Sequence, residues 1–149
     1  MPILDLRPFL PAKDFAISRR FYVELGFTEN FATAEVAEFE IGGFRFLLQN
    51  RYVADWAGNF MMQMLCDDVT DWWLKVEREK FCERYPSIIA KEPKIQPWGL
   101  RVMFLSDPSG VLWHFADRRV MNNGAGDGNR THVSSLGSYS STIELRPHR

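Results

Sequence analysis

The chain reads DFAISRRFYVELG from Asp14 to Gly26 and DVTDWWLKVERE from Asp68 to Glu79, and these two stretches decide the fold. Each begins with an aspartate, which caps the first turn of a helix, and continues with apolar residues at helical spacing. Gly26 is typical of the position where a helix ends. The sequence therefore predicts two amphipathic helices, one in each copy of an internal repeat between Pro11 and Phe115.

Strand-like segments surround both predicted helices. A segment with apolar residues at alternating or neighbouring positions precedes each helix, at Leu4–Leu10 and at Met61–Cys66. A pair of alternating segments joined by a glycine-bearing turn follows each helix, at Glu38–Leu47 and at Met103–Phe115, which is the pattern of a hairpin. The sequence thus predicts the order strand, helix, strand, strand, strand in each of the two repeats.

Composition favours one soluble domain. The 149 residues carry a net charge of only -1, with basic residues interspersed among acidic ones, so nucleic acid is not an expected partner. No apolar run approaches the roughly 20 residues of a membrane helix, and no signal peptide is recognisable, so we expect a cytoplasmic protein without a membrane partner. Residues 118–149 are rich in Ser, Gly, Thr and Arg and are predicted to form a disordered polar tail.

Five motifs in order carry a family resemblance. They are Leu10–Phe15, Phe21–Phe27, Asp67-Asp68-Val69, Trp98-Gly99 and Asp107-Pro108-Ser109-Gly110. Together they resemble the vicinal oxygen chelate superfamily, which contains glyoxalase I, extradiol dioxygenases, fosfomycin resistance proteins and bleomycin resistance proteins. The resemblance implies an α+β fold in which two paired βαβββ modules, here about residues 1–52 and 58–117, form a cupped, mostly antiparallel sheet. It also implies a homodimer whose modules can pair across chains.

The superfamily's metal positions are occupied by unsuitable residues. Most of its enzymes hold a divalent metal with one side chain from the first and one from the last strand of each module, which the repeat places at Arg7, Leu47, Met61 and His114. Arg7 is a permanent cation, Leu47 has no donor atom and Met61 offers only a soft thioether. His114 alone can bind a metal, and one ligand is not a site. We therefore predict no metal, no cofactor and no catalytic residue.

The bleomycin resistance proteins resemble this chain in lacking those ligands. They bind the drug stoichiometrically in crevices between two subunits, using aromatic faces and acidic groups. The resemblance thus implies a homodimer that sequesters a bulky heteroaromatic ligand without turnover. A metal-dependent lyase or oxygenase of the same superfamily is the first alternative, and a structural or partner-binding role with a filled cup is the second.

Strand alternation selects candidate residues for the cup. The predicted ligand-binding residues are Arg7, Arg45, Gln49, Trp56, Phe60, Met61, Trp98 and His114. Trp56, Phe60 and Trp98 fall in or beside predicted loops, where they could clamp a flat ligand or serve loop and dimer packing. His114 could orient a ligand or be a hydrogen-bonded core residue.

The residues predicted to line or border the cup give opposite expectations for the charge of the ligand. Arg7 would favour an anionic or carbonyl-bearing ligand, whereas a cationic ligand would require the acidic residues Glu38, Glu40 and Asp55 near the crevice. The opposite face of the strands is predicted to be buried beneath the helices. Its members are Phe44, Phe46, Leu48, Trp113 and Phe115.

Overall fold

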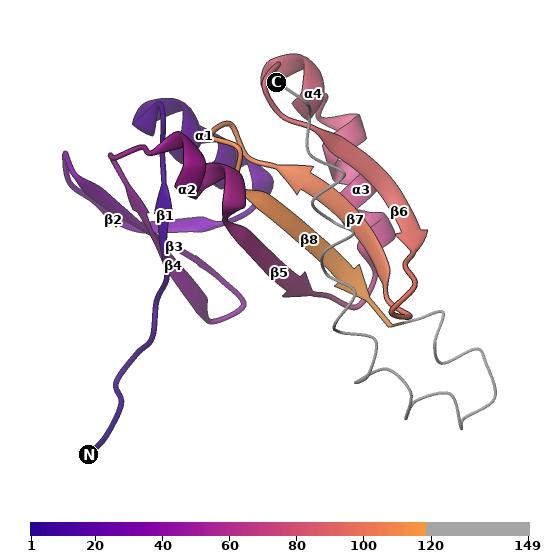
Figure 1. The fold of residues 1–149 in the computed structure, drawn as a ribbon, viewed down its shortest axis with the longest axis horizontal. Helices are drawn as coiled ribbons and strands as arrows, with labels where there is room; N and C mark the ends of the chain where they lie inside the picture. Colours follow the sequence, from indigo (N-terminus) through magenta and orange to yellow (C-terminus); the bar gives the residue numbers. More distant parts are fainter. Residues whose placement is uncertain (119–149) are drawn as a thin grey trace.

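A computed structural model describes residues 1–118, so the predicted tail lies, apart from Arg118, outside the described residues. The first module contains β1 (Phe9–Pro11), α1 (Phe15–Leu25), β2 (Thr28–Ala32), β3 (Val36–Ile41) and β4 (Phe44–Gln49). The short helix α2 (Ala54–Asn59) leads to β5 (Met61–Leu65), α3 (Val69–Arg78), α4 (Phe81–Arg84), β6 (Ala90–Ile95), β7 (Arg101–Ser106) and β8 (Leu112–Asp117). Figure 1 shows the two sheets side by side, with α2 at the connection between them.

The two sheets have the same topology. Their strand orders are β1-β4-β3-β2 and β5-β8-β7-β6. In each, the first strand pairs in parallel with the last, and the other pairs are antiparallel. The predicted α+β fold with a repeated βαβββ order is therefore confirmed. The sequence reasoning did not predict α2 and α4, and Trp56 accordingly lies in a helix rather than in a loop.

Local side-chain chemistry explains where the long helices begin and end. The Asp14 carboxylate accepts a hydrogen bond from the Ile17 amide at 3.1 Å, and the Asp68 carboxylate accepts one from the Thr70 amide at 2.9 Å. Gly26 ends α1 with φ 123°, a conformation that favours glycine because it has no Cβ. Across the described residues, every helix is too short or too polar to span a lipid bilayer.

The helices pack on one face of the sheets and enclose a core that both modules share. Phe46, Leu48, Trp113 and Phe115 are buried there, as predicted. Phe44 contradicts the prediction, because its side chain is 80% exposed. It directly follows the turn at the tip of the β3–β4 hairpin, one pleat beyond the buried Phe46.

A buried polar network joins the modules. The Tyr22 hydroxyl on α1 donates to Asp107 Oδ2 at 2.6 Å and accepts from Trp113 Nε1 at 3.0 Å. Asp107 Oδ1 accepts hydrogen bonds from the amides of Ser109 and Val111. Complete burial raises the pKa of Asp107 to about 6. These bonds fix α1 of the first module against the turn before β8 of the second.

The substitution Tyr22→Phe tests this network. It leaves Trp113 Nε1 and Asp107 Oδ2 buried without their shared partner, so we expect a loss of about 1–3 kcal/mol in the free energy of unfolding. Urea denaturation measures the change, and Tyr52→Phe at a partly exposed tyrosine is the control. A loss no larger than that of the control would show that the network contributes little to stability.

Candidate functional site

The first sheet has an open face opposite α1. A row of paired residues crosses it, in which Phe9 pairs with Leu47, Leu47 with Glu38, and Glu38 with Phe31. The side chains of Phe9 and Phe31, at the two ends of this row, are 50% and 45% exposed, whereas Glu38 between them is buried. The open face thus presents two accessible aromatic rings beside an acidic group.

An ionic network occupies the same face. It consists of Asp5, Arg7, Asn30, Glu38, Glu40 and Arg45. Asn30 donates from its amide nitrogen to Glu38 at 2.8 Å and to Glu40 at 2.9 Å. The hydrogen bond from Asn30 is the main reason why the pKa of Glu38 lies below its ordinary value of 4.5, and the neighbouring Arg7 lowers this pKa further.

The two arginines of the network are both paired. Arg7 forms an ion pair with Glu38, and its Nε lies 3.3 Å from Asp5 Oδ2. Arg45 lies 3.1 Å from a carboxylate oxygen of Glu40 and 3.1 Å from one of Asp5. Two guanidinium groups against three carboxylates leave one negative charge. The expectation that Arg7 would favour an anionic ligand is therefore offset by the carboxylates around it.

The corresponding face of the second sheet carries an apolar cluster. Trp98, Val102, Phe104, Leu112 and Ala116 pack together there, with Met61 at the edge. His114 is also buried on this face, with its ring edge-on to Phe104 at 4.7 Å. Burial lowers the pKa of His114 to about 4, so the imidazole is neutral at pH 7 and a weak base.

The structure distributes the eight predicted ligand-binding residues among three places. Arg7, Arg45 and Gln49 belong to the first sheet and the segment before it, whereas Met61, Trp98 and His114 belong to the second sheet's cluster. Trp56 is exposed on α2, and Phe60, just after that helix, packs against the shared core. The open face of the first sheet and the apolar cluster of the second sheet are therefore formed by different sheets and by different parts of the sequence.

Sequence reasoning did not single out two aromatic residues of the open face, Phe9 and Phe31. The partner of Leu47 is Phe9 rather than Arg7, and the partner of His114 is Gln63 rather than Met61. Phe31 was not singled out either, although alternation along a strand beside Glu38 would have indicated it. These two register pairs, Phe9 with Leu47 and Gln63 with His114, are poor in metal ligands, as are the predicted positions. Among residues 1–118, no three His, Cys, Asp or Glu side chains lie together so that they could hold a metal ion.

Comparison with known proteins defines the class. The sequence model described as "Glyoxalase/Bleomycin resistance protein/Dioxygenase superfamily" matches residues 6–115. This chain belongs to that superfamily. No curated protein sequence matches it.

Solved structures of similar fold include binding proteins and an enzyme. A bleomycin resistance determinant encoded on the transposon Tn5 is 25% identical, with a TM-score of 0.63 over 76% of this chain and 96% of that chain. The bleomycin-binding protein of Streptomyces verticillus, solved with copper(II)-bleomycin, is 21% identical, with a TM-score of 0.63 over 78% of this chain and 98% of that chain. Lactoylglutathione lyase from Agrobacterium tumefaciens is 17% identical, with a TM-score of 0.60 over 80% and 98%. The last two likenesses, at these identities, concern the fold.

The substitution Asn30→Ala tests the electrostatics of the open face. Because Asn30 stabilises the ionised carboxylate, its removal is expected to raise the pKa of Glu38 toward 4.5. The lowered pKa of Glu38 stabilises the fold above pH 4.5, and this contribution is lost as the pH falls through the folded-state pKa. The variant should therefore lose less folding stability than the wild type on acidification. NMR titration of the carboxyl carbon measures the pKa, with Asn50→Ala as the control. An unchanged pKa would contradict the assignment.

Proposed function

We propose that the protein is a homodimer that binds a flat, cationic heteroaromatic small molecule against the open face of the first sheet, without turnover. The observation that carries this proposal is the row in which accessible Phe9 and Phe31 flank Glu38. A planar ligand can contact both rings while its positive charge lies beside the carboxylates.

Several small contributions to the binding free energy favour such a contact. Aromatic pairs contribute about 0.5–1.5 kcal/mol beyond their buried area, and a cation over an exposed ring contributes about 0.5–1 kcal/mol. The ionic network adds one net negative charge on this face. Its side chains are already held by hydrogen bonds, so ordering them on binding costs little entropy.

The relatives support the same class of ligand. Proteins described as binding bleomycin share the fold, and the Tn5 resistance determinant is the most similar of those compared above. In the proposed homodimer, the second sheet's face with Met61, Trp98 and His114 forms the other wall of the crevice. Arg7 and Arg45 balance the charge of the first sheet's open face, and Gln49 and Trp56 border the ligand.

Titration with metal-free bleomycin tests the proposal. We expect saturable binding near one ligand per subunit, measured by isothermal titration calorimetry and by tryptophan fluorescence. Phe31→Ala and Glu40→Gln should each weaken binding by about tenfold, equivalent to about 1.4 kcal/mol, since they remove a ring and a carboxylate from the open face. Leu74→Ala, at a similarly exposed side chain on α3, is the matched control.

Two outcomes would contradict the proposal. Absence of saturation, or equal affinity in Phe31→Ala, Glu40→Gln and the wild type, would remove the open face from ligand binding. Stoichiometric binding of Zn²⁺ or Ni²⁺ by the purified protein would instead favour the lyase or oxygenase alternative, for which the similar fold of lactoylglutathione lyase is the precedent.

A further inference from the structure

The row that crosses the open face of the first sheet has a counterpart in the second sheet. There, Gln63 pairs with His114, His114 with Phe104, and Phe104 with Lys91. Because the two sheets have the same topology, these residues occupy the places that the first sheet gives to Phe9, Leu47, Glu38 and Phe31. The chemistry of the row is changed at two places. An aromatic ring replaces the carboxylate, and a lysine replaces the exposed ring on the outer strand.

An irregularity in β6 brings a second lysine to the same face. The pairing register shifts between Lys91, which lies opposite Phe104, and Lys94, which lies opposite Val102. In a regular strand, residues three apart point to opposite faces, so the bulge redirects Lys94. Pro93 lies in this stretch, where a proline is tolerated because β6 is the outer strand of its sheet. Both lysines therefore belong to the face that carries the apolar cluster.

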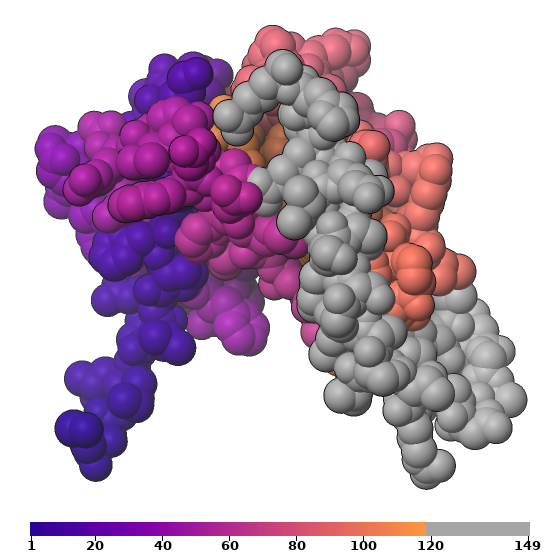
Figure 2. Space-filling model, viewed as in Figure 1, coloured from indigo at the N-terminus to yellow at the C-terminus, as the bar shows by residue number. Residues whose placement is uncertain are grey.

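A hollow of about 350 Å³ lies beside the two lysines. It is lined by Lys91, Glu92, Lys94, Gln96 and Phe104. Phe104 is buried, and its ring packs edge-on against His114. Figures 1 and 2 show β6 along the outer edge of the second sheet, with its salmon surface accessible in this view. The hollow thus combines an aromatic surface with positively charged groups.

The charges that line this hollow are not balanced. Lys91 and Lys94 are exposed, and within residues 1–118 neither of them forms an ion pair. Two ammonium groups against the carboxylate of Glu92 leave one positive charge among the described lining residues. On the first sheet, by contrast, both arginines are paired and the net charge is negative. An ammonium group donates three hydrogen bonds and binds an oxyanion as a compact point charge.

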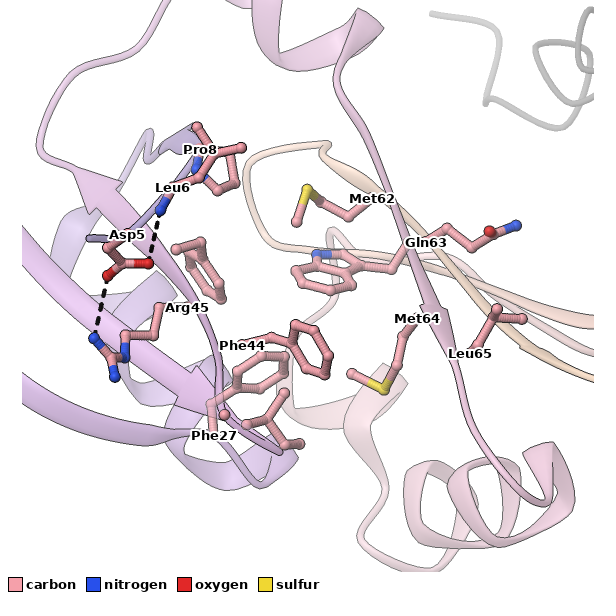
Figure 3. A pocket seen from close by; sticks show the side chains of 14 residues that line it. Asp5, Leu6, Pro8, Phe27, Phe44, Arg45, Met62, Gln63, Met64 and Leu65 are labelled. Carbon is pink, nitrogen blue, oxygen red and sulfur yellow. Dashed lines mark hydrogen bonds and ion pairs between the residues drawn. The ribbon is translucent and has the colours of Figure 1, made fainter. Parts of the chain in front are cut away.

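The cleft between the two modules has a different character. Its volume is about 490 Å³, and its lining includes Phe46, Met62, Met64 and Trp113. Figure 3 shows the two methionines directed into this cleft, and it shows Asp5 at the border bonded to Arg45 and to the Leu6 amide. Because these charges already compensate each other, the cleft attracts an ionic ligand less than the hollow beside β6 does.

We infer that the hollow beside β6 binds an anionic group of the same ligand, so that the ligand is a dipolar heteroaromatic molecule with a carboxylate or another oxyanion besides its cationic group. This inference rests on the proposed function, in which the second sheet's face is the wall opposite the open face. The opposite net charges of the two walls orient the ligand. Its cationic group lies beside Glu38 and Glu40, and its anionic group lies beside Lys91 and Lys94. The reverse orientation would place like charges together, which costs free energy.

Two flat, cationic dyes that differ in one group test this inference. Rhodamine 110 carries a carboxylate, whereas rhodamine 123 is its methyl ester and has the cation without the anion. We expect the wild type to bind rhodamine 110 about tenfold more tightly, equivalent to about 1.4 kcal/mol, as measured by fluorescence anisotropy. The double variant Lys91→Gln, Lys94→Gln should bind the two dyes equally. The control Lys80→Gln, at an exposed lysine before α4, should keep the tenfold preference.

The outcomes separate this inference from the proposed function. Equal affinity of the wild type for the two dyes, or an undiminished preference in the double variant, would overturn the inference. Absence of saturation with rhodamine 110 would overturn it as well. If bleomycin nevertheless binds in a manner that depends on Phe31 and Glu40, the proposed function stands without the anion subsite. If neither the dyes nor bleomycin bind, both fail.

Discussion

The hydrogen bond from Tyr22 to Asp107 is the contact on which the rest of the structure depends. It joins α1 of the first module to the turn before β8 of the second, and Trp113 Nε1 completes it from the neighbouring strand. Burying a charged carboxylate without hydrogen-bond partners costs free energy, and burial accordingly raises the pKa of Asp107 to about 6. Hydrogen bonds from Tyr22 and two backbone amides offset that cost. Because the modules are fixed here, the cleft between them has a defined shape.

For the proposed function, charge pairing determines which ligands the open face of the first sheet favours. Two arginines there would repel a cationic ligand if they stood alone, but each is paired with two carboxylates. The net negative charge and the accessible rings of Phe9 and Phe31 together suit a cationic aromatic molecule. Residue identity alone left the charge of the preferred ligand open, and the contacts among the side chains favour a cationic one.

Elements governed by local chemistry could be predicted from the sequence. Asp14, Asp68 and Gly26 determine the helix ends through bonds within a few residues, and Gly42-Gly43 adopts positive φ values in the predicted hairpin turn. Long-range pairing could not be predicted as well. Counting back from Asp14 indicated Arg7, whereas the parallel register with β4 sets Phe9 beside Leu47.

Weak local signals caused the other differences. Helix α2 has no side-chain cap at its start, so nothing in the sequence marked Trp56 as helical. Phe44 follows the alternation of a buried strand face, yet it lies at the hairpin tip, where the core ends. The ionic network joins residues up to 40 positions apart, a separation that spacing rules do not cover.

Amide chemical-shift mapping with metal-free bleomycin tests the central claim most directly, because it locates the ligand as well as detecting it. The account predicts shifts concentrated at Phe9, Phe31 and Glu38, with little change on the outer face of α3. Shifts confined to the cleft around Met62 and Met64, or no shifts at saturating bleomycin, would contradict it.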